Sequence, residues 1–365
     1  MVRAGYKETE VGVIPIEWGE KKLEDVLEFK YGTSQKEIID DNGEYPIFAT
    51  GGLVGTGRDY IYDKPSVIIG RKGTIDVPQF IEVPFWAIDT TYYTKIYEGT
   101  NPKFVYYLFI LLDWYSYNEA SGVPSLNAST LRKIKVLFPP TLEEQDAIVE
   151  VLSDMDALIA ALDKLIAKKR AIKTAAMQQL LTGKIRLPGF SGEWGEKKLE
   201  DVLEFKYGKS QKEIIDDNGE YPIFATGGLV GTGREYIYDK PSVIIGRKGT
   251  IDVPQFIEVP FWAIDTTYYT KICEDTNPKF VYYLFILLDW YSYNEASGVP
   301  SLNAPTLRII KVPFPPTLDE QDAIVEVFSD MDVEIAALET RRDKTYSIKQ
   351  GMMQELLTGK TRLLD

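Results

Sequence analysis

Two stretches of the chain decide its fold. Residues 141–166 read TLEEQDAIVEVLSDMDALIAALDKLI, and residues 317–342 read TLDEQDAIVEVFSDMDVEIAALETRR. In each stretch a threonine is followed three residues later by a glutamate, which is the capping-box signature of a helix start. Apolar residues then recur in alternating steps of four and three, the heptad spacing of helices that pair. The residues assigned to helix pairing are Ile148, Leu152, Met155, Ile159 and Leu162 in the first stretch and Ile324, Phe328, Met331, Ile335 and Leu338 in the second.

Both predicted helices continue until a Thr-Gly pair, at Gly183 and at Gly359, where glycine is expected as the C-terminal cap. Each helix of about 40 residues would span roughly 60 Å at 1.5 Å per residue. It could pack back on its own domain, but it is much longer than such a domain could cover. We therefore favour pairing of the two helices, which is antiparallel if a pseudo-twofold axis relates them.

The helices belong to an internal repeat. Residues 18–156 return as residues 194–332 at a constant offset of 176, and the two copies differ at nine positions. A repeat of this length can bury its own core, so we expect two globular domains. Short β-type runs broken by glycine and proline predict an α+β domain with a small, irregular sheet. The expected divisions are a first domain at 1–140, a helix at 141–184, a second domain at 185–316 and a helix at 317–365.

The start of the chain bears on how the second helix continues. The first helix leads through residues 184–190 into Trp194, whereas the second helix is followed only by a few residues, and residues 13–18 lead into Trp18, the counterpart of Trp194. The beginning of the chain thus supplies the continuation that the second helix lacks. We expect a circular layout in which the N- and C-termini lie close together.

Composition excludes several kinds of site. The chain contains no histidine, and Cys273 is its only cysteine, so an intrachain disulfide, a Cys/His zinc site and a Cys/His dyad are ruled out. The N-terminus lacks the apolar segment of a signal peptide, and no apolar run reaches the length of a membrane span. We expect a cytoplasmic protein. A net charge of −14 argues against indiscriminate nucleic-acid binding but permits a local basic face.

An ordered set of motifs carries a resemblance to a known family. The segment 120–127 reads ASGVPSLN, residues 135–140 read KVLFPP, and Glu144-Gln145 opens the helix that ends in QLLTGK at 179–184. The series recurs from Ala296 to Lys360, and the opening YKETEVGVIP at 6–15 is also typical. Together these motifs resemble the DNA-specificity subunit of Type I restriction-modification systems over essentially the whole chain.

The resemblance implies a non-catalytic subunit with two target-recognition domains held apart by an antiparallel helix pair. Each domain would read one half of a split double-stranded DNA site, and the helices would set the spacer. Methyltransferase subunits, two of them by this interpretation, would dock along the helices, and restriction subunits would join the larger complex. AdoMet, ATP and Mg²⁺ would belong to those partners, and this chain would hold no cofactor and no metal. Family members usually carry two dissimilar recognition domains. The two domains of this chain are near copies, so they should recognise two identical DNA half-sites in inverted orientation.

Candidate DNA contacts are the basic and polar residues of the glycine-rich turns and of one polar loop. Glycine lets backbone approach phosphate, and arginine can pair with guanine through two hydrogen bonds. The alternative for the basic residues is that their charges are simply solvated at a hairpin tip. The alternative for the asparagines and serines is that they only make the hydrogen bonds of an ordinary turn. Strand alternation leaves only one tyrosine of each Tyr-Tyr pair as a candidate, because the other should face the core. The candidates are Gly52, Arg58, Lys64, Arg71, Lys72, Tyr92, Tyr93, Asn118 and Ser121 in the first copy, and Arg234, Lys240, Arg247, Lys248, Tyr268, Tyr269, Asn294 and Ser297 in the second.

Two other functions compete with DNA recognition. Catalysis is disfavoured, because the glycine-rich turn lacks the Lys and Ser/Thr of a phosphate-binding loop and the double prolines lack the preceding acid or amide of an amino-methyltransferase. A coiled-coil scaffold that binds proteins without DNA specificity would suit the acidic charge. Two of the nine differences, Thr33/Lys209 and Lys133/Ile309, change a charge between the copies. They would make the half-sites differ if they touched bases, and surface drift is the plainer interpretation.

Overall fold

A computed structural model describes residues 5–9 and 12–363, and the chain divides into two compact units. Unit 1 comprises Met1–Asp163 and Thr340–Asp365, and unit 2 comprises Lys164–Glu339. Each unit holds one copy of the repeated domain and part of both long helices. No helix in the described ranges is long and apolar enough to cross a membrane.

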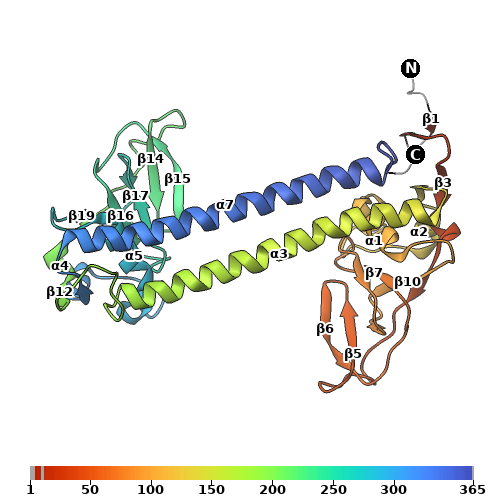
Figure 1. Ribbon diagram of the computed structural model, residues 1–365, viewed down its shortest axis with the longest axis horizontal. Coiled ribbons are helices and arrows are strands. Elements are labelled where there is room, and N and C mark those ends of the chain that lie inside the picture. The colour runs from red at the N-terminus through yellow and green to blue at the C-terminus, as the bar shows by residue number, and fades with distance from the viewer. Residues whose placement is uncertain (1–4, 10–11, 364–365) are drawn as a thin grey trace. The chain divides into compact units, whose positions relative to one another are not determined.

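The domain of unit 1 contains several small sheets (Figure 1). Its principal sheet is antiparallel with the order β4-β10-β7-β8, and a second sheet has the order β6-β5-β9 with β5 and β9 parallel. Two strand pairs, β1-β2 and β11-β3, complete the unit. The strands are β1 (Tyr6–Thr9), β2 (Gly12–Pro15), β3 (Gly19–Lys22), β4 (Leu27–Tyr31), β5 (Tyr45–Ala49), β6 (Gly52–Gly57), β7 (Ser66–Gly70), β8 (Gln79–Ile81), β9 (Trp86–Ala87), β10 (Thr91–Ile96) and β11 (Lys135–Phe138). The α+β prediction with small, irregular sheets is confirmed.

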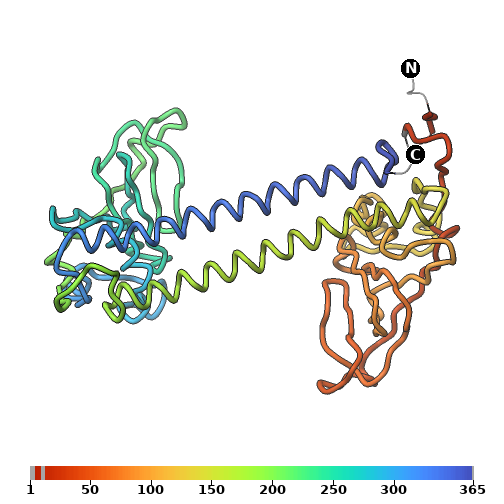
Figure 2. The backbone as a smooth tube through the Cα atoms, in the orientation of Figure 1, coloured from red at the N-terminus to blue at the C-terminus, as the bar shows by residue number. Residues whose placement is uncertain are grey.

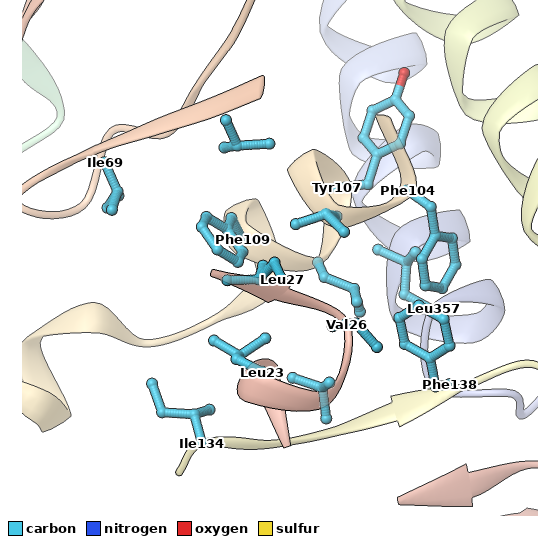
Figure 3. Packing of buried hydrophobic residues seen from close by; sticks show 14 of the residues in the cluster. Leu23, Val26, Leu27, Ile69, Phe104, Tyr107, Phe109, Ile134, Phe138 and Leu357 are labelled. Carbon is cyan, nitrogen blue, oxygen red and sulfur yellow. The ribbon is translucent and has the colours of Figure 1, made fainter. Parts of the chain in front are cut away.

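Helix α1 (Pro102–Leu111) covers the principal sheet. The Asn101 side chain caps it by accepting from the backbone N–H groups of Lys103 and Phe104, and proline occupies its first turn. The helix packs on β7 and β8, and its buried face enters the main core (Figure 3). Leu357, which follows the second long helix, lies in the same core beside Phe104 and Phe138. The short helices η1 (Leu23–Asp25), η2 (Trp114–Tyr117) and α2 (Ala128–Arg132) complete the domain.

Unit 2 repeats this architecture. Its principal sheet has the order β13-β19-β16-β17, and its second sheet has the order β15-β14-β18. In each unit the second sheet contains a hairpin that extends as an arm from its own domain (Figure 2). The elements are β12 (Gly195–Lys198), α4 (Leu199–Val202), β13 (Leu203–Tyr207), β14 (Tyr221–Ala225), β15 (Gly228–Gly233), β16 (Ser242–Gly246), β17 (Gln255–Ile257), β18 (Trp262–Ala263), β19 (Thr267–Ile272), α5 (Pro278–Leu287), η3 (Trp290–Tyr293), α6 (Ala304–Arg308) and β20 (Lys311–Phe314).

The long helices are α3 (Leu142–Leu180) and α7 (Leu318–Leu356). Both begin where the sequence predicts, and the Thr141 hydroxyl accepts from the backbone N–H of Glu144 at 3.2 Å. Both also end as expected, because Gly183 (φ +68°) and Gly359 (φ +70°) adopt the left-handed conformation that favours glycine. A Cβ on Gly183 would lie 3.0 Å from the Trp194 ring, so side-chain packing restricts this position as well.

Within each unit the two helices pair in antiparallel fashion, as predicted. In unit 1, Asp156 forms an ion pair with Lys349, while Asp163, further along α3, pairs with Arg342, which is earlier in α7. Unit 2 follows the same order. Its ion pairs join Lys169 to Glu334, Arg170 to Glu339 and Lys173 to Asp332. Three basic residues of α3 therefore form ion pairs within the helix pair itself.

The first apolar residues of each stretch pack near the end of the other long helix. Ile148 and Leu152 of α3 are buried in one cluster with Met353, Leu356 and Leu357, near the end of α7. In unit 2, Ile324 and Phe328 are buried with Met177, Leu180 and Leu181. These residues therefore contact the other long helix, and antiparallel pairing sets the start of one helix against the end of the other.

One polar cluster ties the helix pair of unit 1 to its domain. The Lys349 Nζ atom lies 2.5 Å from Asp156 Oδ1, and the Tyr107 hydroxyl of α1 donates to Asp156 Oδ2 at 2.8 Å. The Lys349 ammonium also lies 5.3 Å from the centre of the Tyr107 ring. Burial, together with the neighbouring carboxylate, raises the pKa of Tyr107. The cluster fixes α1, α3 and α7 against one another through three different side-chain types.

A buried carboxylate joins the described ends of the chain in unit 1. Glu144, only 1% exposed, accepts hydrogen bonds from Trp18 Nε1 at 3.1 Å and from Arg362 Nε at 2.8 Å. Arg362 also donates to Glu17 at 2.7 Å, and the Tyr6 hydroxyl donates to the Lys360 carbonyl at 3.0 Å. The described segments next to the two termini therefore lie close together, as predicted, while the terminal residues 1–4 and 364–365 lie outside the described residues. In unit 2, Glu320 accepts from Trp194 and Arg186 in the same way.

Candidate nucleic-acid interface

The segment that joins β9 to β10 organises the candidate interface of unit 1. On one side, the Gly32 N–H donates to the Thr91 carbonyl at 3.1 Å, and the Thr33 N–H donates to the Ala87 carbonyl at 2.9 Å. On the other side, the N–H groups of Arg71 and Lys72 both donate to the Thr90 carbonyl. The turn after β4 and the turn after β7 are therefore held beside each other.

Arg71 is oriented by two contacts at this junction. Its Nε and Nη2 atoms donate to the Asp89 carbonyl at 3.2 and 2.8 Å, and its guanidinium carbon lies 5.7 Å from the centre of the Tyr31 ring. In the described part of the chain, Nη1 has no hydrogen-bond partner. A guanidinium held in this way presents a planar donor that loses less side-chain entropy when it binds a ligand.

A polar loop, residues 118–125, lies against the turn that carries Arg71. The Gly73 N–H donates to the Pro124 carbonyl, and the Leu126 N–H donates to the Arg71 carbonyl, each at 2.9 Å. The loop carries the exposed Ser121 near its tip. The Arg71 face is defined here as Tyr31, Arg71, Lys72 and Ser121, and the Arg247 face as Tyr207, Arg247, Lys248 and Ser297.

The Arg247 face of unit 2 repeats these contacts. Arg247 donates through Nε and Nη2 to the Asp265 carbonyl at 3.2 and 2.9 Å, and it lies 5.8 Å from the centre of the Tyr207 ring. Tyr31 and Tyr207 are 57% and 55% exposed, and neither was among the sequence candidates. Alternation along β4 places Tyr31 on the same side as the buried Leu27 and Phe29, so the sequence contains no signal for its exposure.

Asn118 shapes the polar loop from within. Its Oδ1 accepts from the N–H groups of Ala120 and Ser125 at 3.1 and 2.9 Å, and its Nδ2 donates to the Ala120 carbonyl at 2.8 Å. Asn294 makes the same bonds in unit 2. The turn-chemistry interpretation therefore accounts for both asparagines, whose amides are already engaged.

The prediction that one tyrosine of each Tyr-Tyr pair is available to DNA is wrong. Tyr92 and Tyr93 are only 2% and 7% exposed, and Tyr268 and Tyr269 are equally buried. The central position of β10 explains this, because the strand has β4 and β7 as neighbours, and both of its faces are covered by apolar clusters.

Burial of these tyrosines predicts a high-pH transition. Desolvation raises the pKa of Tyr92 to about 12, above the ordinary value of about 10. As the pH rises, the unfolded chain therefore loses this proton at a lower pH than the folded chain does. The stability that the neutral phenol contributes is fully present below about pH 10 and is lost as the pH rises through about 12. Denaturant titrations between pH 9 and 12 should show this fall. The double variant Tyr92→Phe/Tyr268→Phe should weaken it, and an unchanged slope would contradict the assignment.

The remaining basic candidates do not join the Arg71 face. Lys64 precedes β7, whereas Arg71 follows it, so the two side chains start from opposite ends of the strand, about 20 Å apart. Arg58 follows β6 and donates through Nη2 to the Glu37 carbonyl at 2.5 Å. Lys240 and Arg234 occupy the matching places in unit 2. The strand separates Lys64 and Lys240 from the Arg71 and Arg247 faces, and backbone carbonyls engage Arg58 and Arg234, so a role of these four residues in DNA binding stays a prediction.

Gly52 opens β6 at the tip of the hairpin arm with φ +129°. Thr50, which precedes the tip, lies beside Gly73, because a Cβ on Gly73 would be 3.9 Å from the Thr50 hydroxyl. The tip therefore borders the turn that carries Arg71 and Lys72. Its glycine provides the turn conformation, and its role in binding stays a prediction.

Comparison with known proteins identifies relatives of both copies. The family model described as "Type I restriction modification DNA specificity domain" matches residues 15–170 and 191–345. A "Type I restriction enzyme MjaVIII specificity subunit" from Methanocaldococcus jannaschii is 23% identical, with 98% of this chain and 96% of the relative covered. A "Type I restriction enzyme EcoprrI specificity subunit" from Escherichia coli is 21% identical, with 91% of each covered.

A solved structure shows the same fold. The S subunit of the Type I restriction-modification system from M. genitalium aligns with a TM-score of 0.67 at 18% sequence identity. The alignment covers 93% of this chain and 96% of that chain. A fold with two small α+β domains and two long helices is therefore one that an experimental structure also has.

Proposed function

Because this chain belongs to the family of Type I restriction-modification DNA specificity domains, we propose that it is the DNA-recognition subunit of such a system. It reads a split double-stranded DNA site, one half with each domain. The duplication of the Arg71 face as the Arg247 face, with the same contacts to backbone and to tyrosine, carries this proposal. Two like readers related by antiparallel helices match a target with two like, inverted half-sites.

The partners follow from the same proposal. The chain provides recognition without catalysis, so the methyl transfer and the cleavage belong to methyltransferase and restriction subunits. Two methyltransferase subunits dock along α3 and α7, in keeping with the twofold character of the repeat. AdoMet serves the methyltransferase subunits, and ATP and Mg²⁺ serve the restriction subunits.

Methylome sequencing of the host tests the proposal directly. Deletion of the gene should remove methylation from one bipartite motif, whose two halves read the same on opposite strands. A titration of the chain with its methyltransferase subunits, at several salt concentrations, should show preference for that motif. Loss of no motif, together with binding that ignores sequence, would overturn the proposal and favour the protein-scaffold alternative.

Lengthening both long helices by one heptad should change the preferred spacer. Insertion of seven residues after Asp163 in α3 and after Glu339 in α7 adds about 10 Å of helix, or about three base pairs at 3.4 Å each. The motif reported by methylome sequencing should therefore gain spacer length and keep its half-site sequences. A second variant that inserts a different polar heptad at the same places is the control. Altered half-site sequences would show that the helices do not set the spacing.

A further inference from the structure

Two of the nine differences between the copies meet in one cleft of unit 2. Lys209 and Glu235, which replace Thr33 and Asp59 of unit 1, line a cleft of about 600 Å³ together with Lys212, Glu213 and Trp262. The exchange of aspartate for glutamate preserves charge. The exchange of threonine for lysine adds one positive charge to this cleft, whereas Lys212 and Glu213 have the same residue types at their counterparts in unit 1.

The cleft adjoins the Arg247 face. The Lys209 N–H donates to the Ala263 carbonyl at 2.8 Å, and the Lys209 carbonyl accepts from Trp262 Nε1 at 2.8 Å. Lys209 thus lies two residues beyond the exposed Tyr207, at the junction that also anchors Arg247 through the Asp265 carbonyl. Backbone bonds therefore hold this position beside the candidate reading residues.

The Lys209 ammonium is available for a ligand. The residue is exposed, and within residues 5–9 and 12–363 its side chain has neither an ion-pair nor a hydrogen-bond partner. The neighbouring Arg234 is engaged instead, because its Nη2 donates to the Glu213 carbonyl at 2.8 Å. A lysine acts on phosphate as a compact point charge, which suits a backbone contact better than a base contact.

We propose that Lys209 makes a DNA-phosphate contact in the second recognition domain that the first domain lacks. The two domains then read like half-sites with unequal affinity. Neutralisation of one phosphate by lysine releases condensed counterions, whereas threonine at position 33 can at most donate a neutral hydrogen bond. This inference rests on the proposed function, and it refines the picture of two equivalent readers.

Reciprocal exchanges at this pair of positions test the proposal. The chain, in complex with its methyltransferase subunits, is titrated with a fluorescein-labelled duplex that carries the methylated motif, between 50 and 200 mM KCl. Lys209→Thr should lower the magnitude of the slope of log K against log[KCl] by about 0.9, and Thr33→Lys should raise it by about as much. A slope change of that size alters the affinity ratio across this salt range about 3.5-fold. The double exchange, Thr33→Lys/Lys209→Thr, keeps the net charge and should restore the slope of the original chain.

The outcomes separate the possible failures. Equal slopes for all four proteins would overturn the phosphate contact and leave the proposed function standing. A changed half-site preference in Lys209→Thr, with an unchanged slope, would also overturn it, because the lysine would then read a base. If the complex of the original chain shows no preference for the duplex over a scrambled one, the proposed function fails and this inference fails with it.

Discussion

Simultaneous replacement of Arg71 and Arg247 by alanine is expected to abolish most sequence-specific DNA binding. Each arginine contact with a base edge is worth about 1–3 kcal/mol. Loss of both corresponds to about 30- to 20,000-fold weaker binding, at about 1.4 kcal/mol per tenfold. The affinity is measured by fluorescence anisotropy at fixed salt, with the methyltransferase subunits present. Each single variant should lose about half of this free energy, because the two faces have the same contacts.

A matched control separates recognition from the loss of charge. The double variant Lys64→Ala/Lys240→Ala also removes two positive charges, but from the ends of β7 and β16 opposite to Arg71 and Arg247. It should retain the sequence preference of the original chain. Arg71→Lys/Arg247→Lys should bind weakly, because lysine keeps the charge but lacks the planar fork. Equal losses in the alanine variants at 71/247 and at 64/240 would contradict the assignment of the reading faces.

Replacement of Arg362 by alanine is expected to destabilise unit 1 by about 3–5 kcal/mol, the usual cost of leaving one partner of a buried ion pair alone. Glu144 would keep its bond from Trp18 Nε1 but would lose both guanidinium bonds, from Nε at 2.8 Å and from Nη2 at 3.1 Å. Because the chain has two units, hydrogen exchange resolved by peptide is the appropriate measurement. Protection should fall in the core that surrounds Trp18 and Leu357 and remain in unit 2.

Two controls test whether the unpaired Glu144 carboxylate causes the loss of stability. Arg186→Ala removes the equivalent partner of Glu320 and should transfer the loss of protection to unit 2. The double variant Glu144→Gln/Arg362→Met should recover much of the stability, because glutamine carries no charge and still accepts from Trp18. If the double variant is as unstable as Arg362→Ala, the lost packing of the arginine side chain, and not the isolated carboxylate, is the cause.

The long helices show what local sequence can predict. Heptad spacing, a threonine at the start and a glycine at the end depend on residues within one or two turns of each other. The helix bounds, the C-terminal caps and the antiparallel pairing were accordingly predicted. Glu144 marks the limit of this reasoning. The sequence assigned its carboxylate to a capping box, whereas the structure places it against Trp18 and Arg362, which are distant in the chain.

The sequence by itself determined the α+β class, the two copies, the paired helices and the closeness of the chain ends, because periodicity, caps and repetition are local or self-evident signals. Only the tertiary structure decided which residues make up the Arg71 and Arg247 faces. It buried Tyr92 and Tyr93 inside a sheet, engaged Asn118 within its own loop, separated Lys64 from Arg71 by the length of a strand, and exposed Tyr31. The physical reason is that these outcomes depend on strand order and on which turns meet in space. Neither property is encoded in the neighbours of any one residue.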